Sequence, residues 1–209
     1  MRLGLFGGSF DPIHLGHLLL AEYCREQCRL DQVWFIPAAV APHKQRQPFS
    51  VAQHRLEMLS LAIAGHAAFE ICDLELERGG ISYTVDTLQA ISDSQREAEL
   101  FLLMGADTLV DLVNWHRPDD VCSLATPVVV GRPGDAEPDY RGLSGLVSPE
   151  QLSYFRQHQV TMPLVELSSR EIRRRVAGGE SIRYQTPRAV EKYIESHQLY
   201  RDVDRRESD

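Results

Sequence analysis

Two kinds of hydrophobic periodicity alternate along the chain. Short, continuously apolar runs bounded by Gly or Pro predict buried strands, whereas apolar residues spaced three and four apart predict helices. Strands are expected at residues 2–6, 33–37, 68–76, 99–105, 126–134 and 159–167. Helices are expected at residues 15–28, 51–64, 83–92, after 105, and at 148–157, 168–179 and 186–197. Loops rich in Pro or Gly are expected at residues 38–50 and 132–147.

This order predicts an α/β fold, a Rossmann-like doubly wound parallel sheet with helices on both faces. We expect residues 1–180 to form this domain and residues 181–209 to form a small C-terminal helical extension and tail packed on it. Ligands of such sheets bind at the carboxyl ends of strands, near the point where the strand order reverses. The first strand ends at Phe6-Gly7-Gly8, and the last expected strand ends at Leu167-Ser168.

Composition narrows the class of protein. The 209 residues are 43% hydrophobic and 25% charged, which suffices for a substantial core. The net charge of −8 argues against general nucleic-acid binding, because no broad basic surface is available. The start lacks the features of a signal peptide, and no apolar run reaches the roughly 18 residues that span a bilayer. We therefore expect a cytoplasmic protein without a membrane partner, and a homo-oligomer remains possible.

The most informative stretch is GGSFDPIHLGH, residues 7–17. We expect Gly7 and Gly8 to let the backbone turn tightly and approach a ligand. A glycine turn that leads into a helix N-terminus suggests phosphate binding. His14 and His17 lie three apart, so both imidazoles can donate hydrogen bonds to phosphate oxygens from one helix face. Two alternatives are incidental surface histidines and a zinc site, although no third metal ligand lies nearby.

Further polar residues have structural and functional interpretations. Ser168 and Glu171 match a capping box, and the helix start that they define would direct its amides and Arg173 at phosphates. Arg174 and Arg175 turn away from Arg173 and are expected to be solvated or paired at the surface. Ser50 is expected to cap the helix at 51–64, and Asp11 either caps the first helix or orients a histidine. The four cysteines form no CxxC pair, which favours reduced thiols in or near the core.

GGSFDPIHLGH resembles the HxGH signature of a nucleotidyltransferase superfamily. Other segments extend the resemblance to one family, the bacterial nicotinate-mononucleotide adenylyltransferases. These segments are PHK (42–44), SYTVDTL (82–88), GADTL (105–109), NWHR (114–117), LSSREIR (167–173) and SIRYQTPRAVEKYI (181–194). One departure is Arg170, which stands where the family commonly has Thr.

The resemblance implies adenylyl transfer from ATP to nicotinate mononucleotide, with Mg²⁺ bound mainly through the ATP phosphates. It implies no dedicated metal ligand in the protein. The implied catalytic residues are His14, His17, Lys44 and Arg173. The implied ATP and phosphate ligands are Gly7, Gly8, Ser9, Phe10, His43, Gly105, Asp107, Ser168 and Ser169. Thr84, Trp115 and His116 would bind the nicotinate mononucleotide, with Trp115 stacked on its ring; taken alone, Trp115 would be a half-buried core aromatic.

Four other functions are alternatives to adenylyl transfer to nicotinate mononucleotide. A phosphopantetheine adenylyltransferase usually lacks the SYTVDTL and NWHR segments. A nicotinamide-preferring enzyme would bind the amide of nicotinamide mononucleotide in place of the carboxylate of nicotinate mononucleotide, a difference that the sequence shows poorly. An aminoacyl-tRNA synthetase would need an anticodon domain, and the net charge opposes it. A nucleotide sensor without turnover would need fewer phosphate donors than this chain carries.

Overall fold

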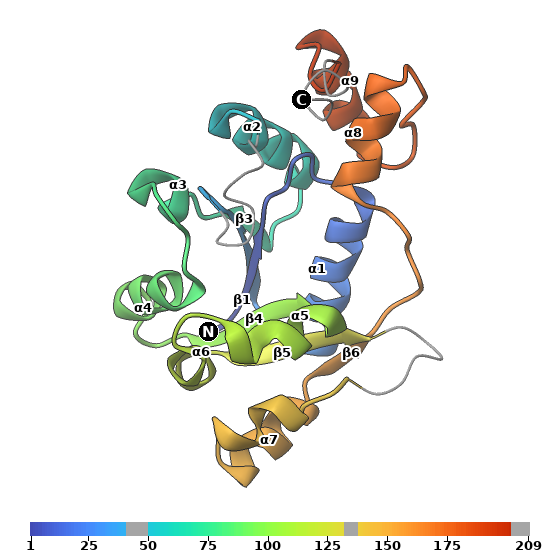
Figure 1. Ribbon diagram of the computed structural model, residues 1–209. Coiled ribbons are helices and arrows are strands. Elements are labelled where there is room, and N and C mark those ends of the chain that lie inside the picture. Colours follow the sequence, from blue (N-terminus) through green and yellow to red (C-terminus); the bar gives the residue numbers. More distant parts are fainter. Residues whose placement is uncertain (41–49, 132–137, 202–209) are drawn as a thin grey trace.

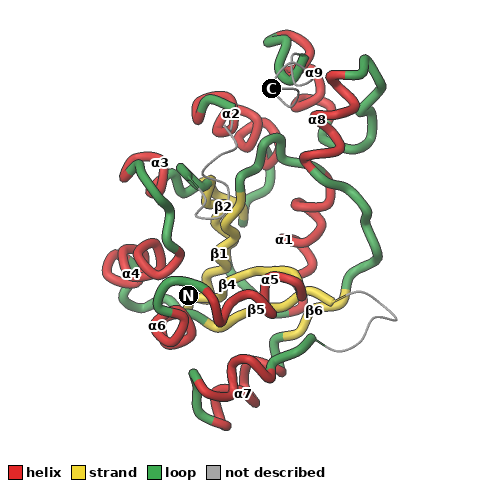
Figure 2. The backbone as a smooth tube through the Cα atoms, in the orientation of Figure 1, coloured by secondary structure: helices red, strands yellow, loops and turns green. Residues whose placement is uncertain are grey.

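The computed structural model describes residues 1–40, 50–131 and 138–201. Its centre is a six-stranded parallel sheet with the order β3-β2-β1-β4-β5-β6 (Figures 1 and 2). The strands are β1 (Arg2–Gly8), β2 (Gln32–Pro37), β3 (Phe69–Ile71), β4 (Glu99–Gly105), β5 (Thr126–Gly131) and β6 (Gln159–Thr161). The strand order reverses between β1 and β4, whose residues Leu3 and Leu100 lie in register. The doubly wound α/β prediction is therefore confirmed.

Nine α-helices occur in the described residues. They are α1 (Leu15–Gln27), α2 (Ala52–Ile63), α3 (Leu74–Arg78), α4 (Thr84–Ser94), α5 (Ala106–Asp111), α6 (Pro118–Leu124), α7 (Pro149–Arg156), α8 (Ser169–Ala177) and α9 (Arg188–Ser196). Short 3₁₀ helices span Leu112–Asn114 and Arg141–Gly145. Within the described ranges, no helix has the length and apolarity to cross a membrane.

The strands bury side chains on both faces, as their continuous apolar runs predict. Along β4, Phe101 and Leu103 face one core cluster, while Leu100 and Leu102 face the other. The first cluster is completed by α1, α2, α8 and α9, and the second by α4, α5, α6 and α7. Ile182 and Val190, from the expected C-terminal extension, belong to the first cluster. Figure 1 shows α8 beside the N-terminal end of α1, with α9 beyond it, on the side of α2.

Two expected strands are shorter than predicted. β3 ends at Ile71, and the chain then forms α3, because the acidic residues Glu75 and Glu77 suit the first turn of a helix. β6 ends at Thr161, which pairs with Gly131, the last residue of β5. Residues 132–134 of the expected strand at 126–134 lie outside the described residues. The alternation of apolar and polar residues in both segments is compatible with a strand. β2 continues to Pro37, beyond Phe35 that pairs with Ile71, so β3 ends because its own chain turns into α3.

Candidate active site

The turn after β1 lies at Asp11 and Pro12, directly after Phe10, so the prediction that Gly7 and Gly8 make it is wrong. Both glycines remain in the strand, and neither has a positive φ. Phe10 has φ +46° and a fully buried ring. A Cβ on Gly8 would lie 2.9 Å from Cζ of Phe10, so Gly8 leaves room for that ring. A Cβ on Gly7 would meet no atom of the described residues within 4 Å, so Gly7 borders open space there.

His14 and His17 share one face at the start of α1, as their spacing predicts. Their rings stack with centroids 3.6 Å apart and planes inclined by 22°. The backbone N–H of His14 donates to Nδ1 of His17 across 3.2 Å. Because Nδ1 accepts this bond, a neutral His17 carries its proton on Nε2, which is then a donor. Phe10 contacts the His17 ring edge-on at 5.1 Å between centroids.

His14 is buried, with 6% of its surface exposed, and burial lowers its pKa to about 4. The ring is therefore neutral at pH 7. Its Nδ1 has no hydrogen-bond partner within the described part of the chain. Such an unmet buried group costs about 1–3 kcal/mol, which a ligand atom would offset. Gly16 makes room for this ring, because a Cβ there would lie 3.1 Å from Nδ1 of His14.

Side chains from three distant segments hold the carbonyl oxygens of the turn between β1 and α1. The bonds are Arg55 Nη1 to Ser9 (2.9 Å), Arg173 Nη1 to Asp11 (2.7 Å), Ser169 Oγ to Pro12 (2.8 Å) and Thr186 Oγ1 to Ile13 (2.8 Å). Arg173 and Ser169 were predicted as phosphate ligands; in this structure they anchor the backbone of the turn. Arg55 and Thr186 were not predicted. Arg55 precedes the buried Met58 and Leu59 by three and four positions, a spacing that places it on the core face.

Asp11 accepts two hydrogen bonds instead of capping α1 or orienting a histidine. Its carboxylate receives the hydroxyl of Tyr200 at 2.6 Å and the backbone N–H of Ser50 at 3.0 Å. The prediction of Ser50 as the cap of α2 is wrong, because Val51 occupies that position. Ser50 faces Asp11, and its carbonyl oxygen accepts from Nε of Arg55.

The start of α8 has the Ser168 half of the predicted capping box, while the Glu171 side chain pairs with Arg174 instead of the Ser168 backbone. Oγ of Ser168 accepts the backbone N–H of Glu171 at 3.1 Å. The Glu171 carboxylate pairs with Arg174 at 2.8 Å, and Glu180 pairs with both Arg174 and Arg175. These ion pairs confirm the prediction that Arg174 and Arg175 are paired at the surface. The N-terminal amides of α8 lie beside the turn, since Ser169 bonds to Pro12.

The predicted nucleotide ligands on β4 come to the same sheet edge. Gly105 ends β4, next to β1, and is the N-cap of α5. Asp107 is exposed in the first turn of that helix. The strand order reverses between β1 and β4, where a crevice is expected in this class of fold. Gly7, Gly8 and Gly105 therefore border one candidate site.

The predicted ligands of the second substrate lie on two neighbouring segments. Thr84 begins α4, and Trp115 and His116 follow the 3₁₀ helix at Leu112–Asn114. The rings of Tyr83 and His116 approach to 4.6 Å between centroids, which brings the two segments together. Trp115 is half-buried and packs against the second core cluster. The predicted catalytic Lys44 and its neighbour His43 lie outside the described residues.

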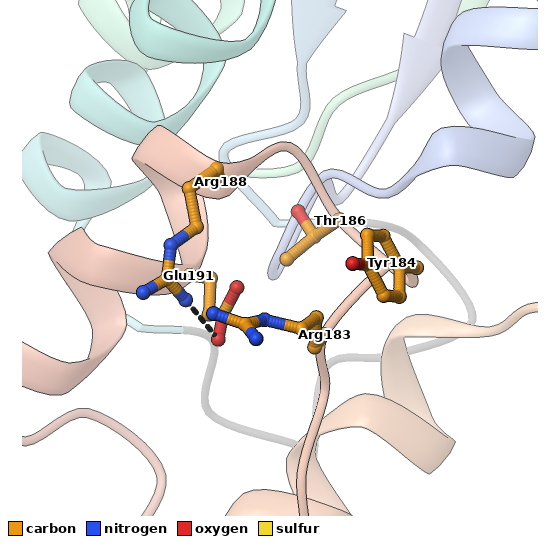
Figure 3. Close-up of a pocket in the computed structure, with 5 residues that line it drawn as sticks. All are labelled: Arg183, Tyr184, Thr186, Arg188 and Glu191. Atoms are coloured by element: carbon orange, nitrogen blue, oxygen red, sulfur yellow. Dashed lines mark ion pairs between the residues drawn. The ribbon is translucent and has the colours of Figure 1, made fainter.

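A pocket of about 330 Å³ adjoins the anchor at Thr186. Figure 3 shows its lining residues Arg183, Tyr184, Thr186, Arg188 and Glu191, with Arg188 paired to Glu191 at 2.5 Å. Tyr184 is 81% exposed and has φ +64°.

The residues described contain no group of three or more His, Cys, Asp or Glu side chains that could hold a metal ion.

Comparisons with known proteins place this chain in a class. Residues 5–175 match the model of the cytidylyltransferase-like family. A probable nicotinate-nucleotide adenylyltransferase of Salinibacter ruber is 41% identical over 98% of this chain and all of its own length. One from Thermus thermophilus is 45% identical over 96% of this chain and all of its own length. The chain belongs to the nicotinate-nucleotide adenylyltransferase family.

A solved structure agrees with the fold. The Plasmodium falciparum nicotinic acid mononucleotide adenylyltransferase, complexed with NaAD, superposes with a TM-score of 0.72. The match covers 95% of this chain and 97% of that one, at 16% sequence identity. At that identity the likeness concerns the fold alone.

Proposed function

We propose that the protein transfers the adenylyl group of ATP to nicotinate mononucleotide, giving deamido-NAD and pyrophosphate in NAD biosynthesis. The observation that carries the proposal is the stacked pair of His14 and His17 at the N-terminus of α1. This pair lies beyond β1, beside the point where the strand order reverses. Relatives more than 40% identical over nearly the full chain, named for this activity, support the choice of substrates.

In this reaction a 5′-phosphate oxygen of nicotinate mononucleotide attacks the α-phosphorus of ATP in line. The new P–O bond forms as the bond to the β-phosphate oxygen breaks, and pyrophosphate leaves. Catalysis consists of positioning and charge stabilisation. His17 would donate from Nε2 to an α-phosphate oxygen, where negative charge develops. The neutral His14 would contact phosphate beside it, and its unpaired Nδ1 supports a ligand at this place.

The remaining phosphate and nucleotide ligands surround the same turn. Nη1 of Arg173 donates to the carbonyl oxygen of Asp11. The other N–H groups of the guanidinium can donate to a phosphate. The amides at the start of α8 would add donors, and the positive end of the helix favours an anion. The other proposed ATP ligands are Gly7, Gly8, Ser9, Phe10, His43, Lys44, Gly105, Asp107, Ser168 and Ser169.

The acceptor nucleotide is proposed to bind between the start of α4 and the segment at Trp115. The indole would stack on the nicotinate ring, and Thr84 with the backbone near His116 would meet its carboxylate. The contact between Tyr83 and His116 supports this arrangement, since it holds the two segments next to each other.

Mg²⁺ is proposed to arrive with the ATP phosphates, whose charge it would neutralise. Mg²⁺ is commonly bound through substrate phosphates and water, with few protein ligands. We also propose a cytoplasmic location, which the four free cysteines support, since free thiols are typical of a reducing compartment.

The test is pyrophosphate release from ATP and Mg²⁺ with three acceptors, namely nicotinate mononucleotide, nicotinamide mononucleotide and phosphopantetheine. A kcat/KM many-fold higher for the nicotinate acceptor is expected. A higher value for another acceptor would keep the chemistry and overturn the substrate. Release with none of the three would favour a nucleotide sensor.

His17→Ala tests the assigned donor. We expect kcat to fall by about 10²–10³, the usual loss when one such donor is removed, while the Kd for ATP changes far less. His66→Ala is the matched control, because His66 pairs with Glu22 and stacks on Phe69, away from the turn. An unchanged kcat in His17→Ala would refute the role.

A further inference from the structure

Asp11 and Tyr200 join the turn after β1 to the far end of the described chain. The Tyr200 hydroxyl donates to Oδ1 of Asp11 at 2.6 Å, across 189 positions of sequence. Asp11 is 3% exposed, and its Oδ2 accepts the backbone N–H of Ser50 at 3.0 Å. Each carboxylate oxygen of Asp11 therefore has one donor from a distant segment. This pairing holds a buried charge in one orientation.

The opposite charge for this buried carboxylate comes from Arg55, which is 2% exposed. Burial lowers the pKa of Arg55, and the nearby Asp11 charge partly offsets that shift. Burial and the Asp11 charge both raise the pKa of the Tyr200 hydroxyl. Tyr200 is consequently protonated and acts as a donor at neutral pH.

The backbone around this pair is strained on both sides of the contact. Phe10, directly before Asp11, has φ +46°, and Tyr200 itself has φ +64°. Bulky residues reach this region at a cost and remain there only when the surroundings hold them. The Asp11 carbonyl in turn accepts the guanidinium of Arg173 at 2.7 Å. One residue therefore joins Tyr200, through its carboxylate, to Arg173, through its carbonyl.

We propose that Tyr200 is a positioning residue for the reaction, which fixes the Asp11 carboxylate and thereby the turn that presents His14 and Arg173. The inference rests on the proposed function. It assigns a task to the segment that follows α9, for which the sequence indicated only packing. Tyr200 touches no substrate in this scheme and acts through Asp11. Its loss would loosen the turn while leaving every predicted phosphate ligand in place.

The experiment compares Tyr200→Phe with Tyr193→Phe. Both variants remove one tyrosine hydroxyl near the C-terminus; that of Tyr193 bonds to Nδ1 of His54 at 2.7 Å, on α2. We expect Tyr200→Phe to lose more thermal stability than Tyr193→Phe, because its hydroxyl bonds to a buried carboxylate, so kcat is compared well below both melting temperatures. Only Tyr200→Phe should lower kcat, by about 10- to 100-fold, as small misplacements of reacting groups do, with a smaller change in the KM for ATP. Equal losses of kcat in both variants would overturn the proposal.

A second readout needs no substrate. Hydrogen–deuterium exchange of the backbone amides at residues 9–18 should quicken in Tyr200→Phe and stay unchanged in Tyr193→Phe. Unchanged exchange in Tyr200→Phe would overturn the proposal whatever happens to kcat. If the wild type releases no pyrophosphate with any acceptor, the proposed function fails, while the exchange data still decide whether Tyr200 holds the turn.

Asp11→Asn completes a double-mutant cycle. The asparagine keeps a similar shape but removes the charge and one acceptor. If Tyr200 acts through Asp11, the double variant should lose little more kcat than the worse single variant, since coupled residues are not additive. Fully multiplicative losses would show that the two residues act separately and would overturn the proposal.

Discussion

The backbone N–H of His14 donates to the ring of His17, and the two imidazoles stack 3.6 Å apart. The two histidines therefore differ in burial and in hydrogen bonding. His14 is buried and neutral, and it supports the neighbouring ring. His17 is partly exposed, and its Nδ1 accepts the His14 N–H, so the proposed phosphate donor is Nε2.

The lowered pKa of His14 makes stability depend on pH. In the unfolded chain His14 titrates near its ordinary pKa of 6.5, whereas in the fold its pKa is about 4. Between these values the unfolded state binds more protons, so the free energy of unfolding falls as the pH drops. At about pH 5 the loss from this residue is about 2 kcal/mol.

The measurement is urea unfolding at about pH 7.5 and about pH 5 for the wild type and His14→Gln. The glutamine has no titrating group, so the variant should lose about 2 kcal/mol less than the wild type between the two pH values. Losses of equal size in both proteins would show that His14 does not carry this dependence.

The alternation of strands and helices was predictable from the sequence, because buried parallel strands are continuously apolar and their limits carry Gly or Pro. The β4 run ELFLLMG is an example, and its predicted bounds are confirmed. The lengths of β3 and β6 were not predictable in the same way. β3 ends before its neighbour β2 does, because the chain turns into α3, and β6 ends level with the last residue of β5. The apolar pattern of each segment shows neither limit.

In the candidate site, contacts within one helix were predictable from the sequence, and contacts between distant segments were not. The pairing of His14 with His17 follows from helix geometry, so the spacing alone predicts it. The anchors at Arg55, Thr186 and Tyr200 were missed, because each bonds to a turn far away in sequence. Only Arg55 left a signal, as a charged residue on the apolar face of its helix. Whether the predicted ligands bind nucleotides stays a prediction.

Gly7 and Gly8 should respond in opposite ways to an added methyl group. In Gly8→Ala the new Cβ would press on the buried Phe10 ring at 2.9 Å, and such overpacking typically costs about 1–3 kcal/mol. In Gly7→Ala the Cβ would enter open space, so stability should hold. That space is where the nucleotide is proposed to bind, so Gly7→Ala should weaken ATP binding.

Urea unfolding and calorimetric ATP titration separate the two effects. Gly131→Ala is the control for Gly7→Ala, because Gly131 also ends a strand and its Cβ would meet no atom within 4 Å. It lies on β5, one strand further from β1 than β4. ATP affinity that is equal in Gly7→Ala and Gly131→Ala would argue against a nucleotide at Gly7.

The two tryptophans offer a test of the acceptor site. Stacking of an aromatic side chain on a base is worth about 1–3 kcal/mol, so Trp115→Ala should raise the KM for nicotinate mononucleotide about 5- to 150-fold. The KM for ATP should change little, because the proposed ATP ligands lie around the β1 turn and the start of α5. Trp34→Ala is the control: Trp34 also packs half-buried against the second core cluster, and its indole donates to Gln32 at 3.3 Å. Steady-state kinetics with each substrate varied in turn would show whether the two variants differ. If both raise the acceptor KM alike, the effect comes from lost core packing, and Trp115 does not stack on the ring.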